Sequence, residues 1–575
     1  MALLILSLLL QAALLPPGMT QVDTSREDRL VKTALEYIET NRKGTAEIRL
    51  LDEITRTPVS GAVVQYRQTS HDFMFANLFW GDVSKMQELG LEWDGDVWLS
   101  WTDIERTRGV YDFSKPDSTI RWLRQYRQVR IFARFTGFFL DWNYVVSTPP
   151  PRPPSFADFD HIDDPAVFAR YKNLAYEFVF NVATHYKGTI QAYVTQWEIN
   201  WPSVAVTDGL SKQPAWTVQQ AVEVNEVVSR AIRDADPTAI IMLGTSTAWE
   251  GPSPYDMGPI QFTKLCLRSG VDVDIVALEG YPFDGGPAFF YDYVKTLAKL
   301  GKPVFIEETG YPSVKPNADE SWVRSWKWHV FNEHVQALWN RYMFILMFGI
   351  KEAVGVSAFT LRDQEITVPY LTVFSSMGLF TTTWQHKESA VTLRELMANF
   401  TTSGTVVTDD EGIVTLRGFA GDYTVRVGGY EPVTIHISEG TTEDLNVSLS
   451  REKTSEYYDA AKAVESASVA LSALRSRQLK TQEARNLTEV AAVEYELAVA
   501  SLDRWELDAA QTHAELSQQL ANQALQAEAQ YQQQQDYLKF SAVLAAMVLI
   551  VAVIAISLVR SRTAPKARKE DAATS

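Results

Sequence analysis

The segment PVFIEETGYP, residues 303–312, decides how this chain folds. An apolar, β-prone run leads into Glu307 and Glu308 and stops at a Gly-Tyr-Pro turn. In a barrel of alternating strands and helices, the functional site lies at the carboxyl ends of the strands. Glu308, at the end of this strand, is therefore a candidate catalytic residue.

Around this motif, residues 71–400 alternate strand-like and helical segments eight times. Such alternation predicts an α/β fold, the (β/α)8 or TIM barrel. Before the barrel, residues 22–70 predict a helix and a β-hairpin, formed by residues 46–50 and 62–66, that covers the barrel bottom. The predicted barrel strands are residues 73–79, 97–104, 129–135, 190–199, 240–244, 273–278, 304–308 and 353–361.

The sequence changes character twice after the barrel. Residues 401–450 contain short β-branched runs between Gly and Asp turns, which predict a small β-sandwich. A packed appendage is favoured over a sugar-binding module, because the segment has no cluster of Trp residues. Residues 451–538 lack Gly and Pro and are rich in Ala, Leu, Glu and Gln, which predicts a helical or coiled-coil stalk with a break at residues 485–488. The alternative is an oligomerisation module that joins copies of the chain into a homo-oligomer.

Both ends of the chain carry apolar runs. Residues 1–21 predict a secretory signal peptide, with an N-terminal core helix as the alternative. Residues 540–559 are apolar over about 20 residues, the length that a helix needs to cross a bilayer. Basic residues are concentrated in the segment 560–575 that follows. This charge bias predicts a single-pass protein of the cell membrane, with a cytoplasmic tail and a large extracellular N-terminal part.

Composition excludes several classes of function. The net charge of −18 argues against a nucleic-acid partner, because phosphate binding requires clustered Lys and Arg. Cys266 is the only cysteine, and the eight His residues are scattered along the chain. A zinc site built from several cysteines is therefore excluded, and we expect neither a metal nor another cofactor.

A second carboxylate lies in the segment YVTQWEINWPS, residues 193–203. In the predicted strand order Glu198 ends the fourth strand and Glu308 the seventh, and these ends face each other across the barrel mouth. Glycoside hydrolysis requires one carboxylic acid and one carboxylate on opposite sides of the sugar. If the two carboxyl groups are about 5 Å apart, the reaction retains the anomeric configuration.

These motifs resemble a known group of enzymes. The segment IEETGYP, residues 306–312, is similar to the nucleophile motif of retaining (β/α)8 glycoside hydrolases of clan A, with Glu308 at the nucleophile position. The segment WTDIERTRGVYDFS, residues 101–114, is similar to the second-strand segment of glycoside hydrolase family 10, the xylanase family. The resemblance covers residues 45–400 and implies a divergent family 10-like fold.

The sequence departs from that family at three strands. On the sixth, Glu279 and Tyr281 stand where the family has Gln and His. Family 10 places its acid/base Glu directly after an Asn, whereas here Trp201 follows Asn200 and Glu198 precedes it by two residues. The family's third strand carries histidines, and residues 129–137 contain none. Because a one-residue shift turns a side chain to the opposite face, the acid/base requires a bulge to bring Glu198 into register.

Roles for the other residues follow from their positions. Alternation predicts that Glu307 points away from the barrel axis and forms a salt bridge with the helical layer. Asn200 is expected to bind the sugar 2-hydroxyl or to cap a loop, Glu279 is a reserve acid, and Tyr281 orients Glu308 or packs. The remaining predictions are sugar stacking or core packing for Trp142, Trp201 and Trp101, and an ion pair between Arg362 and Asp363.

The sequence thus predicts a membrane-anchored retaining glycoside hydrolase that cleaves a β-linked polysaccharide, most like an endo-β-1,4-xylanase. Glu308 is the predicted nucleophile and Glu198 the predicted acid/base. The alternatives are a degenerate barrel that binds glycan without cleaving it and a structural display unit in a cell-surface layer.

Overall fold

The computed structural model describes residues 22–78, 82–125, 129–138, 153–200, 217–247, 257–282, 285–316, 328–366 and 369–562. The chain forms two compact units. The first unit comprises residues 1–49, 60–427 and 432–446, and the second comprises residues 50–59, 428–431 and 447–575.

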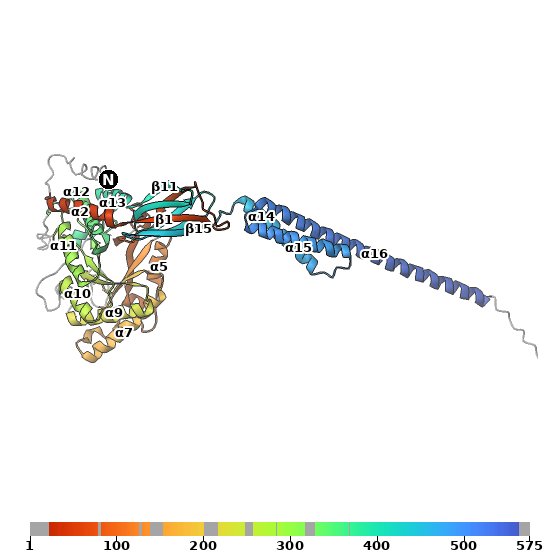
Figure 1. The fold of residues 1–575 in the computed structure, drawn as a ribbon. Coiled ribbons are helices and arrows are strands. Elements are labelled where there is room, and N and C mark those ends of the chain that lie inside the picture. The colour runs from red at the N-terminus through yellow and green to blue at the C-terminus, as the bar shows by residue number, and fades with distance from the viewer. Residues whose placement is uncertain are drawn as a thin grey trace, which may run out of the picture. The chain divides into compact units, whose positions relative to one another are not determined.

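The core of the first unit is a closed barrel of eight parallel strands in the order β10-β3-β4-β5-β6-β7-β8-β9. All eight predicted strands are present, which confirms the TIM barrel (Figure 1). The fourth barrel strand is shorter than predicted, because the chain turns after Val194. The strands are β3 (Met74–Leu78), β4 (Trp93–Ser100), β5 (Arg130–Thr136), β6 (Ala192–Val194), β7 (Ile240–Ser246), β8 (Ile275–Glu279), β9 (Val304–Thr309) and β10 (Ala353–Phe359).

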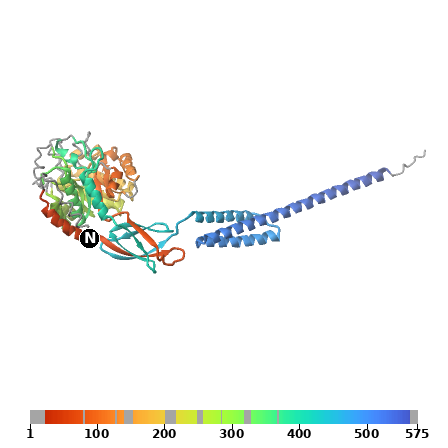
Figure 2. The same ribbon diagram turned by 90° about the horizontal axis from the view of Figure 1, so that it is seen from above.

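Helices follow the strands and surround the barrel (Figure 2). Their ends carry the expected caps: Asp164 caps α7, which has Pro165 in its first turn, and Thr217 forms a capping box with Gln220 at α9. The helical elements are α3 (Val83–Glu88), α4 (Trp101–Ile104), α5 (Ser114–Leu123), η2 (Ser155–Ala157), η3 (Phe159–His161), α7 (Pro165–His185), α9 (Val218–Ala235), α10 (Pro259–Arg268), α11 (Pro287–Leu297), η4 (Ala298–Leu300), α12 (Glu333–Phe348), η6 (Pro369–Ser376) and α13 (Glu388–Phe400). The predicted N-terminal helix is α2 (Ser25–Asn41), which packs against α11 and α12.

The predicted N-terminal hairpin is wrong. β1 (Lys43–Asp52) and β2 (Val63–Gln68) belong to different sheets, with the orders β12-β1-β15 and β11-β2-β13-β14. The β-sandwich is therefore built from both sides of the barrel sequence, since each N-terminal strand buries its apolar face against strands that follow residue 400. The other strands are β11 (Ser403–Val407), β12 (Ile413–Phe419), β13 (Gly421–Val427), β14 (Val433–Ile437) and β15 (Thr442–Leu449).

The second unit contains three helices, α14 (Ser455–Arg475), α15 (Gln482–Asp503) and α16 (Leu507–Arg562), which pack side by side. The chain turns at residues 476–481 and 504–506, so the break predicted at residues 485–488 is wrong. Small buried residues form the seam: on α15 they are Ala484, Ala491 and Ala498, one every seventh residue. This spacing lets the backbones approach closely, and it replaces the Leu or Ile seam of a typical coiled coil.

Among the described residues, α16 is the one helix that is long and apolar enough to cross a membrane. Its C-terminal half contains the predicted span at residues 540–559. The predicted signal peptide and nearly all of the predicted tail lie outside the described residues.

Candidate active site

Two consecutive glutamates enter the barrel because β9 contains a bulge. Towards β8, Ile306 pairs with Leu278 and Glu308 with Glu279, so β9 has one residue more than its neighbour. The pairing with β10 is shifted at the same place. A bulge of this kind turns a side chain out of the regular alternation. The ring of Phe305, two residues before Glu307, contacts Phe132 of β5 across the barrel at 5.4 Å, so alternation also directs Glu307 inward.

The prediction that Glu307 faces the helical layer is therefore wrong. Its salt bridge exists, but the partner is Arg134 of β5, whose Nε donates to Glu307 Oε1. Both side chains are fully buried. Nη2 of Arg134 lies 3.5 Å from Glu308 Oε1, so one guanidinium serves both carboxylates. Burial opposes the charge of Arg134, but Glu307 and Glu308 raise its pKa and keep it a cation.

Glu308 is held from several directions. The Tyr281 hydroxyl donates a hydrogen bond of 2.6 Å to Glu308 Oε2, which is the orienting contact predicted for Tyr281. The Glu308 carbonyl accepts from the N–H of Gly280 at 2.7 Å. Gly310 lets the end of β9 approach β10, since a Cβ there would lie 2.3 Å from the Phe359 carbonyl oxygen. Backbone contacts thus hold the main chain at Glu308, and Tyr281 holds its carboxylate.

Opposing effects of burial and of neighbouring groups determine the pKa of Glu308. Burial raises its pKa to about 7, although Arg134, Tyr281 and Trp197 act in the opposite direction and the neighbouring Glu307 adds to the rise. Burial and the adjacent carboxylates raise the pKa of Tyr281 well above its ordinary value. Tyr281 therefore stays protonated and remains a hydrogen-bond donor to Glu308.

A second pair of carboxyl groups lies beside Glu308. Glu279 is the register partner of Glu308 on β8, and its carboxyl group interacts with that of Glu198. Burial raises the pKa of Glu279 well above its ordinary value, and the charges of Glu198 and Glu308 raise it further. Glu198 follows β6 with a left-handed backbone, φ 46°, and is 8% exposed. Glu198 precedes Asn200 instead of following it, so an irregular backbone is needed to bring its side chain into register. The left-handed conformation at Glu198 is such an irregularity.

Asn200 has a structural role. Its amide nitrogen donates to the carbonyl oxygens of Ser246 and Met257, both at 2.9 Å, and its amide oxygen accepts from the Ser246 N–H at 2.8 Å. The side chain is buried and ties two loops together. The prediction that Asn200 binds the substrate is corrected to the capping role.

Among the predicted stacking residues, Trp101 is a core residue. It is 0% exposed, its ring stacks on Phe178 of α7, and its indole N–H donates to Glu105. No face of the ring is left for a sugar, so the stacking prediction for Trp101 is corrected to core packing. The predictions for Trp142 and Trp201 fall outside the described residues.

Two half-buried tryptophans lie near Arg134. The rings of Trp98 on β4 and Trp197 after β6 contact each other edge to face at 5.9 Å. The Arg134 guanidinium lies 5.5 Å from the Trp98 ring centre, and the Trp197 indole lowers the pKa of Glu308. The barrel mouth therefore combines carboxylates, one cation and partly accessible aromatic surface.

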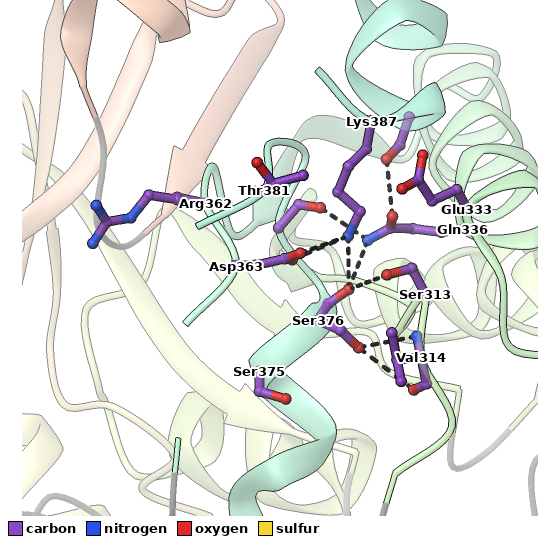
Figure 3. A network of polar contacts seen from close by, with 12 residues as sticks. Ser313, Val314, Glu333, Gln336, Arg362, Asp363, Ser375, Ser376, Thr381 and Lys387 are labelled. Atoms are coloured by element: carbon purple, nitrogen blue, oxygen red, sulfur yellow. Dashed lines mark hydrogen bonds and ion pairs between the residues drawn. The ribbon is translucent and has the colours of Figure 1, made fainter. Parts of the chain in front are cut away.

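The end of the eighth barrel strand differs from the prediction (Figure 3). Asp363 pairs with the buried Lys387, whose Nζ lies 3.0 Å from Asp363 Oδ1 and donates to the Ser376 carbonyl at 3.0 Å. Figure 3 shows Arg362 pointing away from this network, and its guanidinium lies 5.2 Å from the Trp384 ring centre. The predicted Arg362–Asp363 pair is therefore wrong.

Arg134 and Trp98 are the site residues that sequence reasoning missed. The strand RIFARFT, residues 130–136, places an arginine among apolar residues in the middle of a barrel strand. Because a buried arginine requires a carboxylate partner, this pattern could have identified Arg134 as a neighbour of the predicted catalytic glutamates. Among the described residues, no cluster of His, Cys, Asp and Glu is arranged to hold a metal ion.

Comparison with known proteins finds similar solved structures but no matching family. No family model and no curated protein matches the chain. The chain is similar to solved glycoside hydrolases. One is a family 10 enzyme from Paenibacillus barcinonensis, with 14% identity, 57% of this chain and 96% of that chain covered, and a TM-score of 0.42. Xylanase B from Clostridium stercorarium F9 has 15% identity, coverages of 56% and 97%, and a TM-score of 0.42.

A third similar structure is the exo-β-1,4-mannosidase Op5Man5 from Opitutaceae bacterium strain TAV5. It has 16% identity, 61% of either chain covered, and a TM-score of 0.40. The assignment of the fold rests on the closed barrel of eight parallel strands in this chain.

Proposed function

We propose that this chain is a retaining glycoside hydrolase that cleaves a β-linked polysaccharide, most like an endo-β-1,4-xylanase. The observation that carries the proposal is a cluster of buried carboxyl groups at the carboxyl ends of barrel strands: Glu307 and Glu308 contact Arg134, and Glu279 interacts with Glu308 and Glu198. Buried carboxylates with displaced pKa values are a feature of catalytic sites. In this fold, the strand ends that carry them are where catalysis takes place.

Glu308 is the nucleophile in this proposal. It attacks the anomeric carbon as a carboxylate, and Arg134 and Tyr281 favour its ionised form. Attack forms a covalent glycosyl-enzyme intermediate and breaks the glycosidic bond. The second half of the reaction is hydrolysis of that ester by water, which restores the Glu308 carboxylate.

The Glu198–Glu279 pair supplies the proton. Burial and the neighbouring carboxylates raise the pKa of Glu279, which favours retention of a proton by the pair. Glu198 is the more exposed of the two, at 8% against 2%, so it meets the leaving oxygen. After bond cleavage Glu198 accepts a proton from the attacking water, as microscopic reversibility requires.

A glycan-binding barrel without activity is the second candidate. Asn200 is committed to backbone groups, and the Asn-Glu order of the resembled family is missing. In that case the carboxylates and the tryptophans at the mouth bind sugar hydroxyls and rings without bond cleavage.

The proposed location is the outer face of the cell membrane. The apolar part of α16 spans the bilayer, and the basic residues after it keep the tail in the cytoplasm. Helices α14 and α15 with the start of α16 form the stalk. Contact between stalks of two copies remains part of this proposal.

The test uses the full chain in detergent with xylan, mixed-linkage glucan, mannan and galactan as substrates. Glu308→Gln lowers reducing-sugar release on the preferred polymer roughly a thousandfold or more, because the nucleophile is lost. Glu198→Gln abolishes polymer cleavage but releases a first equivalent of phenol from an activated aryl glycoside, which needs no protonation. Retained polymer binding without release in the wild-type protein would favour the binding candidate. Release that survives in Glu308→Gln would overturn the assignment of the nucleophile.

A further inference from the structure

A polar groove of about 860 Å³ lies at the side of the barrel opposite to the carboxylates. Leu91, Glu92 and Val129, which line it, immediately precede β4 and β5, whereas the carboxylates lie at the other ends of the strands. The β11-β2-β13 part of the sandwich forms the facing wall. This volume is within the range of small-ligand sites.

Two arginines stand next to each other on the sheet that forms this wall. Arg67 of β2 pairs with Ser403 and Thr424, and Gln65, two residues earlier on the same face, pairs with Arg426 of β13. Arg67 and Arg426 are therefore diagonal neighbours on one face. Both are exposed, and both line the groove.

The charge of this arginine pair is not neutralised within the part of the chain that the structure describes, where neither side chain forms an ion pair or a hydrogen bond. The carboxylate of the groove, Glu92, is already bound: Arg130 Nη2 lies 2.7 Å from it, and the His71 N–H donates to it at 2.9 Å. This positively charged pair contrasts with the net charge of −18 of the whole chain.

We propose that this groove binds an acidic saccharide, with Arg67 and Arg426 on the carboxylate of a uronic acid residue. Arginine matches a carboxylate with two parallel hydrogen bonds. The other lining side chains are mainly amides and hydroxyls, which pair with sugar hydroxyls; they include Gln65, Gln87, Ser403 and Thr405. The site is independent of the barrel mouth, so a hydrolase and a glycan-binding barrel would both use it to hold an acidic polymer.

The experiment measures binding of oligogalacturonates to the full chain in detergent by titration calorimetry. These oligosaccharides are α-linked, so the proposed hydrolysis of β-links does not consume them. Neutral xylo-oligosaccharides of equal length are the comparison ligand. Arg67→Gln and Arg426→Gln are each expected to weaken oligogalacturonate binding at least about tenfold, as for loss of a charge-assisted hydrogen bond.

The matched control is Arg49→Gln, which removes an exposed arginine from β1 in the other sheet and lies outside the groove. It leaves the affinity within about twofold, and added salt weakens binding of the wild-type protein. The proposal is overturned if the wild type binds no oligogalacturonate, if neutral oligosaccharides bind equally well, or if Arg49→Gln weakens binding as much as Arg67→Gln. Equal affinity for polyglutamate would point to an acidic polypeptide as the ligand instead. Binding that Glu308→Gln removes and Arg67→Gln leaves intact would place the ligand at the barrel mouth.

Discussion

Two buried ionic clusters lie at the carboxyl ends of barrel strands, and they differ in how their charges are balanced. In the first cluster Arg134 contacts Glu307 and Glu308, and the carboxyl groups of Glu279 and Glu198 lie next to this group. Around Lys387, one lysine meets Asp363, and the Ser376 carbonyl and the Gln336 amide complete the network (Figure 3). The first cluster has an excess of negative charge, whereas the second is neutral.

This difference in charge balance helps to distinguish a buried polar network with a catalytic role from one with a structural role. A balanced pair with satisfied hydrogen bonds fixes the segments that it joins, here η6 and the starts of α12 and α13. An excess of carboxylates in a buried site destabilises the folded protein and is retained where chemistry requires it. The following substitutions test that contrast.

Lys387→Met is expected to have the largest effect on stability. The lysine side chain is 1% exposed, and its loss leaves Asp363 buried without its cation. Removal of one partner of a buried pair costs about 3–5 kcal/mol. Urea unfolding of the full chain, followed by the fluorescence of the barrel tryptophans, measures this cost.

The control for this measurement is Lys351→Met, which removes an exposed lysine that follows α12. Its free energy of unfolding stays within about 0.5 kcal/mol of the wild type, as for an ordinary surface position. If Lys387→Met cost no more than this control, the Lys387 network would not be the structural cluster described above.

Glu308→Gln is expected to stabilise the folded protein at neutral and alkaline pH and to leave its stability unchanged at acid pH. The pKa of Glu308 is raised from 4.5 to about 7, so the unfolded chain releases this proton at lower pH than the folded protein does. The contribution of Glu308 to the free energy of unfolding is therefore fully present below pH 4.5 and is lost as the pH rises through about 7. Gln does not ionise, so at pH 8 the variant is more stable than the wild type by on the order of 3 kcal/mol.

Melting temperatures of the two proteins at pH 4.5, 6, 7 and 8 check this prediction. The curves coincide at the acid end and separate as the pH rises. A constant difference at every pH would mean that the gain comes from packing and not from the charge of Glu308. Glu388→Gln, at an exposed site, serves as the control for removal of one negative charge.

Much of the barrel could be predicted from the sequence, because its signals are local. Each strand is a short apolar run, and helical segments with caps such as Thr217 separate the runs. The position of Glu308 at a strand end follows from the same pattern. The sandwich could not be assembled in this way, because the partners of β1 and β2 lie more than 300 residues later in the chain.

The detailed site depended on backbone irregularities that a periodic pattern does not contain. The bulge in β9 turns Glu308 into the site beside Glu307, and the left-handed backbone at Glu198 interrupts the regular strand pattern. Alternation counted back from Glu308 across the bulge therefore predicted the wrong face for Glu307. Arg134 was visible as a charge within an apolar strand, but its partners are set by packing across the barrel.

Tyr281→Phe is expected to have the smallest effect of these substitutions. It tests the role of a single hydrogen bond in the carboxylate-rich cluster. The variant keeps the ring that packs edge to face on Phe359 and Phe374 and removes only the hydroxyl that donates to Glu308. That bond lowers the pKa of Glu308, so its loss raises this pKa above about 7. The acid limb of kcat/KM, which reports ionisation of the nucleophile in the free enzyme, then moves to higher pH by about one unit. A packing role for Tyr281 predicts a lower rate with an unchanged pH profile. The shift of the acid limb, measured on the polymer that the wild-type protein cleaves, therefore distinguishes an orienting hydrogen bond from a structural ring.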